Sequence, residues 1–142
     1  MISQTKVKWV DGIQFEGTDE SGHQVIMDGA VDNGGTDRGF RPTKLLVMAL
    51  AGCTGMDVIS ILKKKHAKVK SFEINIKAES NDEYPKKFQT MHVEYVLSGL
   101  ALVEEEVKRA IQLSEEKYCI IRNTLAPSVT LSSSYKILSE NL

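Results

Sequence analysis

The sequence predicts an α+β fold with an antiparallel sheet and the element order βββ-α-ββ-αα-β. Strand-like and helix-like segments occur in blocks instead of alternating, and the longest apolar segment is long enough for a central helix. At 142 residues the chain fits one domain, which we assign to 1–142. A domain of this size needs neither disulfides nor a metal ion to fold.

Three strands are predicted near the N-terminus. The runs KVKWV and IQFEG flank Asp11-Gly12, a dipeptide typical of two-residue hairpin turns. The turn-forming stretch TDESG then leads to a third run, HQVIMDG. The Gly- and Asp-rich segment 30–42 is too polar to form a core, and its DNGGTDRG stretch lacks the spacing of a phosphate-binding loop. We interpret this segment as a mobile lid or connector.

The most apolar segment, LLVMALAGCTGMDVISIL, follows Pro42. Proline suits the first turn of a helix and the cations of KKKH suit its last turn, so we expect a helix from Pro42 to about Lys65. Such a helix would be about 36 Å long at 1.5 Å per residue. Positions 45–51 are all apolar, so the helix needs cover on every side. A second copy of the chain is the economical cover, which predicts a homodimer.

The second half of the chain predicts a strand pair, two helices and a last strand. Apolar residues alternate over 72–78 and again over 91–97, as in two one-sided antiparallel strands. Between 100 and 118 the apolar positions step by three and four, which indicates an amphipathic helix. A short helical turn over IIRNTLAP and a strand over SVTLSSSYKIL complete the order.

Composition and charge argue against several functional classes. The net charge of −1 gives no reason to expect a nucleic-acid partner, and we interpret the lysines of KKKHAKVK as a solvated helix end. Lys44, Thr54, Asp57 and Ser60 interrupt the apolar segment, which argues against a membrane span. The start MISQTKVKWVDG lacks the apolar region of a signal peptide. We therefore predict a cytoplasmic protein without a membrane partner.

The two cysteines are the candidate reactive residues. Cys53 lies within AGCTG, whose small side chains leave space for a substrate, and Cys119 follows the second predicted helix. A thiolate needs nearby positive charge, which Arg38 and Arg41 of the preceding loop could supply. The residue pattern leaves open that both thiols are inert core residues. Two cysteines and three scattered histidines show no zinc-ligand spacing, so we predict no metal and no cofactor.

The chain resembles the OsmC/Ohr family of thiol peroxidases, and in particular its YhfA-like branch. The segments VKWVDGIQFEG, SGHQVIMDG, RPTKLLVMALAGCTGMDVISILKKK and LSEEKYC carry this resemblance across nearly the whole chain. It implies an intertwined homodimer with two central helices and an active site at the subunit interface. It also implies that Cys53 is the peroxidatic cysteine and Cys119 the resolving one, with an organic hydroperoxide as substrate and a dithiol as reductant.

The chain departs from the family pattern at Pro42-Thr43-Lys44. Family members with peroxidase chemistry carry a glutamate shortly after this proline, which holds an arginine against the thiolate. Lys44 precedes Cys53 by more than two helical turns and cannot replace that group within its own helix. Arg38 and Arg41 are the two candidates for the arginine. The alternative function is therefore a slow or non-catalytic dimer that binds an apolar small molecule.

Overall fold

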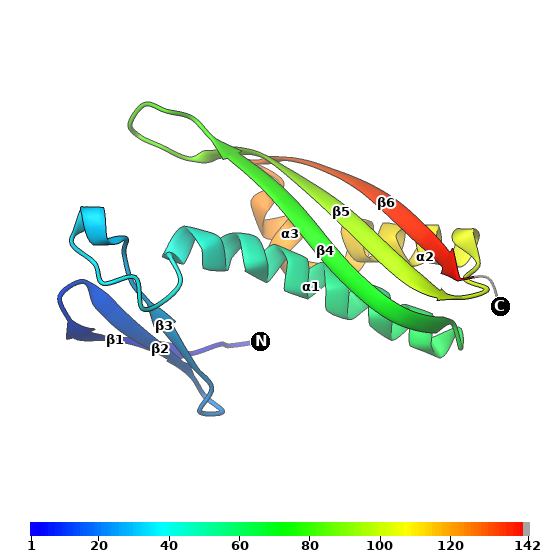
Figure 1. The fold of residues 1–142 in the computed structure, drawn as a ribbon, viewed down its shortest axis with the longest axis horizontal. Helices are drawn as coiled ribbons and strands as arrows, with labels where there is room; N and C mark the ends of the chain where they lie inside the picture. The colour runs from blue at the N-terminus through cyan, green and yellow to red at the C-terminus, as the bar shows by residue number, and fades with distance from the viewer. Residues whose placement is uncertain (141–142) are drawn as a thin grey trace. The chain divides into compact units, whose positions relative to one another are not determined.

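The computed structural model describes residues 1–140 of the chain. Contacts between Cα atoms divide the chain into two compact units, Met1–Leu46 and Val47–Leu142. Each unit has its own three-stranded sheet (Figure 1). The α+β class and the element order are as predicted, while the assignment of 1–142 to one domain stays a prediction.

The N-terminal unit is built on an antiparallel meander in the order β1-β2-β3. Its strands are β1 (Thr5–Asp11), β2 (Gln14–Asp19) and β3 (Gln24–Met27). Gly12 has a φ of 55°, the left-handed conformation that a tight hairpin needs and that glycine adopts without strain. The predicted hairpin is therefore confirmed, but its two turn residues are Gly12 and Ile13, because Asp11 still pairs with Gln14.

The loop after β3 is organised by the carboxylate of Asp28, which is only 3% exposed. Asp28 accepts hydrogen bonds from the backbone N–H of Gly29 (2.7 Å), Thr36 (3.2 Å) and Arg38 (3.2 Å), and from Thr36 Oγ1 (2.7 Å). These bonds, led by that of the Thr36 side chain, lower the pKa of Asp28 to about 2. The segment contains the 3₁₀ turn η1 (Val31–Asn33). It has a defined, hydrogen-bonded conformation, and its interpretation as a mobile lid or connector stays a prediction.

Helix α1 (Pro42–Lys64) agrees with the predicted central helix. Its buried residues repeat every fourth position and form one stripe: Leu50, Thr54, Val58 and Leu62. Another side stays uncovered in the single chain, where Met56 is 73% exposed. By length and composition alone α1 could cross a membrane, a property shared by the core helices of soluble proteins.

The second unit has a sheet in the order β4-β5-β6, formed by β4 (Lys68–Ser80), β5 (Phe88–Leu100) and β6 (Thr130–Glu140). Strands β4 and β5 are antiparallel, as predicted. Strand β6 instead runs parallel to β5, with Tyr135 opposite Tyr95. The helical segments between β5 and β6 supply the long crossover that a parallel pair requires.

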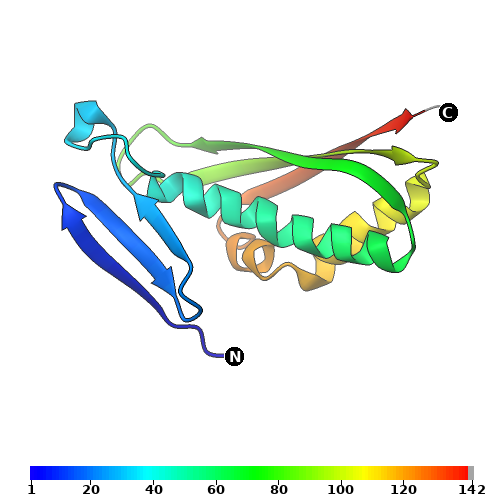
Figure 2. The ribbon, with the colours of Figure 1, turned by 60° about the horizontal axis from the view of Figure 1, so that its bottom comes forward.

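That crossover consists of α2 (Glu104–Leu113), the π-helical turn η2 (Ser114–Tyr118) and α3 (Ile120–Leu125). Figure 2 shows these helices on the same face of the sheet as α1. Helix α2 begins later than its apolar spacing suggested, because β5 runs to Leu100 and Ala101 takes a φ of 52°. The core between the helices and the sheet includes Leu50, Val58, Leu62, Met91, Val93, Tyr95, Leu97, Val107, Ala110, Ile111 and Cys119.

Candidate functional site

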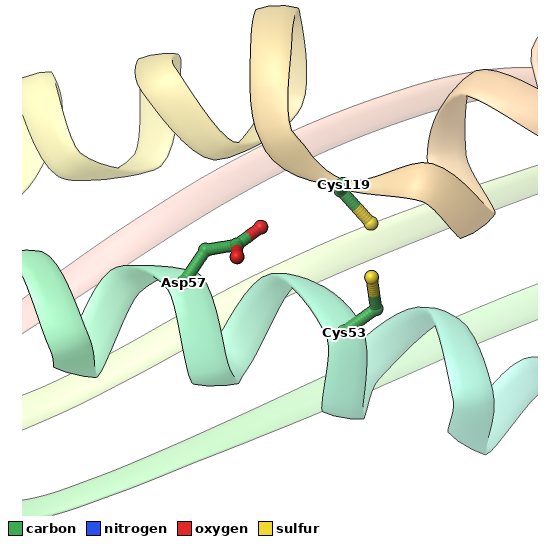
Figure 3. Close-up of side chains that lie close together, drawn as sticks. All are labelled: Cys53, Asp57 and Cys119. Atoms are coloured by element: carbon green, nitrogen blue, oxygen red, sulfur yellow. The ribbon is translucent and has the colours of Figure 1, made fainter. Parts of the chain in front are cut away.

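The structure brings the two cysteines together. The Sγ atoms of Cys53 and Cys119 and a carboxylate oxygen of Asp57 all lie within 4.8 Å of one another. Figure 3 shows the two thiols pointing toward each other, with Asp57 one turn further along α1 than Cys53. Both cysteines are free; Cys53 is partly exposed, whereas Cys119 is fully buried. Residues distant in sequence thus form a compact site of two thiols and one carboxylate.

The π-helical turn η2 sets the position of Cys119. Its backbone N–H donates to the carbonyl oxygen of Ser114, five residues earlier, at 2.8 Å. The chain then extends at Cys119, with a ψ of 105°, and Cys119 caps α3 by accepting the N–H of Arg122 on Sγ at 3.4 Å. Turns of this type occur frequently at functional sites.

The Cys119 thiol stays protonated at neutral pH. Burial is the largest cause of this shift and raises the pKa of Cys119 to about 11. Hydrogen bonding to Cys53 and the charges of Cys53 and Asp57 act in the same direction, whereas the Arg122 N–H acts against them. This lowers the reactivity of the Cys119 thiol, because the thiolate is the reactive form.

A chain of hydroxyl groups lies beside the cysteines, in the core of the unit. Thr54 Oγ1 is 2.8 Å from Tyr95 OH and 2.8 Å from Ser114 Oγ. Ser114 Oγ in turn donates to Asp57 Oδ2 at 2.8 Å. Thr54, Tyr95 and Ser114 are each at most 1% exposed. This series of hydroxyl groups, the hydroxyl chain, therefore links α1, β5 and η2. It ends on the Asp57 carboxylate beside the two thiols.

The other end of the hydroxyl chain is Glu115, whose Oε1 accepts a hydrogen bond from Tyr95 OH at 3.1 Å. Burial, with a smaller effect of Glu115, raises the pKa of Tyr95 well above its usual value. Glu115 Oε2 lies 3.7 Å from Arg122 Nη2, and both side chains are largely buried, at 15% and 19% exposed. Arg122 thus contacts Cys119 through its backbone N–H and Glu115 through its guanidinium group.

Sequence reasoning missed both Arg122 and the hydroxyl chain. The sequence signal for a contact between Arg122 and Cys119 was their spacing of about one helical turn. The predicted arginines, Arg38 and Arg41, both belong to the N-terminal unit. Arg38 contributes its backbone N–H to Asp28, and Arg41 Nη1 pairs with Asp37 Oδ1 at 2.6 Å. Their role beside Cys53 stays a prediction.

Cys53, Asp57 and Cys119 are also the residues to consider for a metal ion. Among the side chains that the structure describes, residues 1–138, they form the one group of at least three His, Cys, Asp or Glu residues with donor atoms this close together. Two thiolates and a carboxylate are ligand types that zinc accepts, although zinc sites in proteins take a fourth ligand. The spacing argument against a metal considered cysteine and histidine only, and the absence of a metal stays a prediction.

Comparison with known proteins places the chain in a family. The family model described as OsmC-like protein matches residues 34–134. The Escherichia coli protein YhfA is 37% identical over 136 residues, which cover 96% of this chain and 98% of that protein. A hypothetical protein from Aquifex aeolicus has a similar fold, with a TM-score of 0.86, 26% identity and 99% coverage of both chains.

A more distant structure adds a description of activity for a protein of the same fold. The organic hydroperoxide resistance protein OhrB of Bacillus subtilis matches with a TM-score of 0.61 and 18% identity. The match covers 96% of this chain and 98% of that protein. At this identity the likeness shows the shared fold alone.

Proposed function

Because the chain belongs to the OsmC-like protein family, we propose that it reduces organic hydroperoxides in the cytoplasm through Cys53 and Cys119. The observation that carries the proposal is the approach of the two Sγ atoms to within 4.8 Å, on elements 66 positions apart in the sequence. Two free thiols this close can exchange between a dithiol and a disulfide. The resistance function described for structural neighbours agrees in substrate class.

Cys53 acts first in this mechanism because its side chain is the more exposed of the two. Its thiolate sulfur attacks one peroxide oxygen, the O–O bond breaks, and the alkoxide leaves as an alcohol after taking a proton. Cys53 is then a sulfenic acid. The sulfur of Cys119 attacks the Cys53 sulfur, an S–S bond forms, the S–O bond breaks, and the hydroxyl group leaves as water with the Cys119 proton. An external dithiol returns two electrons and two protons.

Titration of the reduced protein with cumene hydroperoxide tests this proposal. We expect the loss of two thiols per chain for each equivalent of peroxide, with a Cys53–Cys119 disulfide identified by mass spectrometry. Competitive alkylation at neutral pH should label Cys53 before Cys119, because the thiolate is the reactive form and Cys119 is held protonated. Thiols that survive excess peroxide, or faster labelling of Cys119, would contradict the assignment.

The folded unit in this proposal is a homodimer. In the single chain, large apolar side chains are exposed on β1 and on α1, among them Val7 (56%), Trp9 (61%) and Met56 (73%). Exposed apolar surface of this kind marks interaction sites, and a second copy of the chain is the partner that the length of α1 favours. Sedimentation equilibrium should give twice the chain mass at micromolar concentration. A stable monomer would contradict this part of the proposal.

A specific observation favours the alternative, an OsmC-like dimer that binds an apolar small molecule. The N-terminal unit contains a hollow of about 660 Å³ with a mainly apolar lining that includes Val7, Ile13, Phe15 and Met27. This volume is in the range of small-molecule sites. If binding is the function, a fluorescent apolar probe should bind equally well to the Cys53→Ser/Cys119→Ser variant. The thiols of the wild-type protein would then resist peroxide.

A further inference from the structure

The hydroxyl chain beside the cysteines contains more hydrogen-bonded contacts than it has hydroxyl protons. The oxygen atoms run in the order Asp57, Ser114, Thr54, Tyr95, Glu115, with four O···O distances of 2.8, 2.8, 2.8 and 3.1 Å. Each distance is that of a hydrogen bond, and each hydrogen bond needs one proton. The three hydroxyl groups supply three protons.

A fourth proton completes the chain. If both terminal carboxylates were ionised, one pair of oxygen atoms would face each other at 2.8 Å through lone pairs alone. That arrangement is repulsive in a buried environment, where an unmade hydrogen bond costs the full desolvation of its groups. A proton on either Asp57 or Glu115 removes the conflict. The four contacts therefore have a place for one proton beyond the three of the hydroxyl groups.

The two ends of the chain face different surroundings. At one end, a carboxylate oxygen of Asp57 lies within 4.8 Å of both Sγ atoms, a distance that one water molecule or a peroxide oxygen can bridge. At the other end, Glu115 lines an open hollow of about 620 Å³ between α2, η2 and β6. Water in this hollow can exchange protons with Glu115, while the hydroxyls between the two ends are buried.

We propose that Asp57, Ser114, Thr54, Tyr95 and Glu115 form a proton relay that serves Cys53. The inference rests on the proposed peroxidase function. The relay delivers a proton through Asp57 to the alkoxide that leaves when the O–O bond breaks. Glu115 takes up a replacement proton from water, and the proton of the Cys53 thiol passes to water when the thiolate forms. The net reaction is unchanged: a thiol and a hydroperoxide give a sulfenic acid and an alcohol.

A purely structural role would give the same hydrogen bonds, so the test compares two reactions of the same sulfur. Cumene hydroperoxide needs a proton on its leaving alkoxide, whereas iodoacetamide releases iodide, which needs none. Both reactions use the Cys53 thiolate, so a change in its population or exposure alters both rates together. Only a defect in proton delivery slows the peroxide reaction alone.

Thr54→Val breaks the relay in the middle with little change of shape, and Tyr95→Phe removes its link to Glu115. In each variant we expect the peroxide rate of Cys53 to fall about 100-fold, the size of a lost general acid or base. The iodoacetamide rate should stay within about threefold. Thr54→Ser, which keeps a hydroxyl, should restore the peroxide rate. Combining the first two substitutions should cost no more than either alone, because they act on one relay.

Tyr135→Phe is the matched control. Tyr135 lies beside Tyr95 on β6 and also donates to a glutamate, Glu104 Oε1, at 2.7 Å. This glutamate belongs to α2 and is outside the relay, so Tyr135→Phe should leave both rates unchanged. Near-ultraviolet circular dichroism checks that each variant is folded. If Thr54→Val does not fold, the comparison of the two rates is made with Tyr95→Phe.

Three results would overturn the relay: equal slowing of both reactions in the variants, no slowing of either, or the same selective slowing in Tyr135→Phe. A wild-type protein that reacts with iodoacetamide but not with peroxide identifies a different failure, that of the proposed peroxidase function. An active wild type with unaffected variants shows that the peroxidase stands and the relay does not.

Discussion

Two aspartates, Asp28 in the N-terminal unit and Asp57 in the second unit, lie in polar clusters that differ in their number of hydrogen-bond donors. Asp28 receives four hydrogen bonds, from Gly29, Thr36 and Arg38 of the following loop. Asp57 receives one, from Ser114, and faces the thiols of Cys53 and Cys119. Asp28 has donors for both its oxygens, whereas the cluster of Asp57 has fewer hydroxyl protons than hydrogen-bonded contacts.

This difference explains what each cluster can do. A carboxylate surrounded by donors keeps its charge, because every donor stabilises the ionised form. Asp28 therefore holds the loop in place. A cluster short of protons has more than one arrangement of similar energy, and a proton can move through it. Such a cluster is suited to a reaction that releases and consumes protons.

Replacing either cysteine should give the largest effects. In Cys53→Ser the peroxide reaction should fall to background, because the attacking sulfur is lost. In Cys119→Ser the reaction should stop at the Cys53 sulfenic acid, which dimedone traps and further peroxide overoxidises. Mass spectrometry distinguishes these products. If Cys119→Ser turns over as fast as the wild type with a dithiol, Cys119 is not the resolving thiol.

A matched pair of glycine substitutions compares the packing of the two regions. A Cβ on Gly35 would overlap the carbonyl oxygen of Gly29, so Gly35→Ala should lower the free energy of unfolding by about 1–3 kcal/mol. A Cβ on Gly52, beside Cys53, meets nothing within 4 Å. Gly52→Ala should raise the free energy of unfolding by about 0.5–1 kcal/mol through its helix propensity. Urea denaturation measures both.

A loss of stability in Gly52→Ala would be informative as well. It would indicate that a second chain packs against this side of α1 in the assembled protein, at a position left open in the single chain.

Acid unfolding should reveal the charge of Asp28. Its pKa falls from 3.8 to about 2 on folding, so ionised Asp28 stabilises the fold fully above pH 3.8, and this contribution disappears as the pH falls through 2. In Asp28→Asn the pH dependence of the unfolding temperature between these values should become shallower. Differential scanning calorimetry at several pH values checks this, with Asp82→Asn in the exposed β4–β5 loop as the control. An unchanged pH dependence of the unfolding temperature in Asp28→Asn would show that the loop does not lower the pKa of Asp28.

The smallest effect is expected for Thr36→Val, which removes one hydrogen bond to Asp28 and leaves three. The free energy of unfolding should fall by about 0.5–1.5 kcal/mol, the usual net value of one such bond. The reactions of Cys53 should stay unchanged, in contrast to Thr54→Val. A slower peroxide reaction in Thr36→Val would show that the loop contributes to the chemistry.

Most of the fold was predictable because apolar periodicity is local. The strand pattern of 72–78 and 91–97 and the helix from Pro42 were readable from neighbouring residues, and the structure has β4, β5 and α1 there. The parallel placement of β6 was not, because strand direction depends on the path of the crossover. The Asp28 loop was interpreted as a connector, because four hydrogen bonds to one carboxylate leave no periodic pattern.

The site was predictable only in part. The cysteines stood out by residue type, and the family resemblance paired them. Thr54, Tyr95 and Ser114 looked like ordinary members of helical or strand patterns, since their hydroxyls meet only through the tertiary fold. Arg122 was overlooked because its position depends on the π-helical turn before Cys119, which no local propensity indicates.

The π-helical turn η2 places one more residue between Ser114 and the N–H that bonds its carbonyl oxygen than an α-helical turn would. In a continuous α-helix successive residues turn by about 100°, and a π-turn accommodates one extra residue without extending the helix by a full step. Deleting one residue between Ser114 and Cys119 would convert the bond from the Cys119 N–H to the Ser114 carbonyl oxygen into an ordinary α-helical one and leave Cys119 at about the same angle around the helix axis. The position of Cys119 is therefore less sensitive to a one-residue deletion in this turn than to a one-residue insertion, which would turn the residues after it by about 100°.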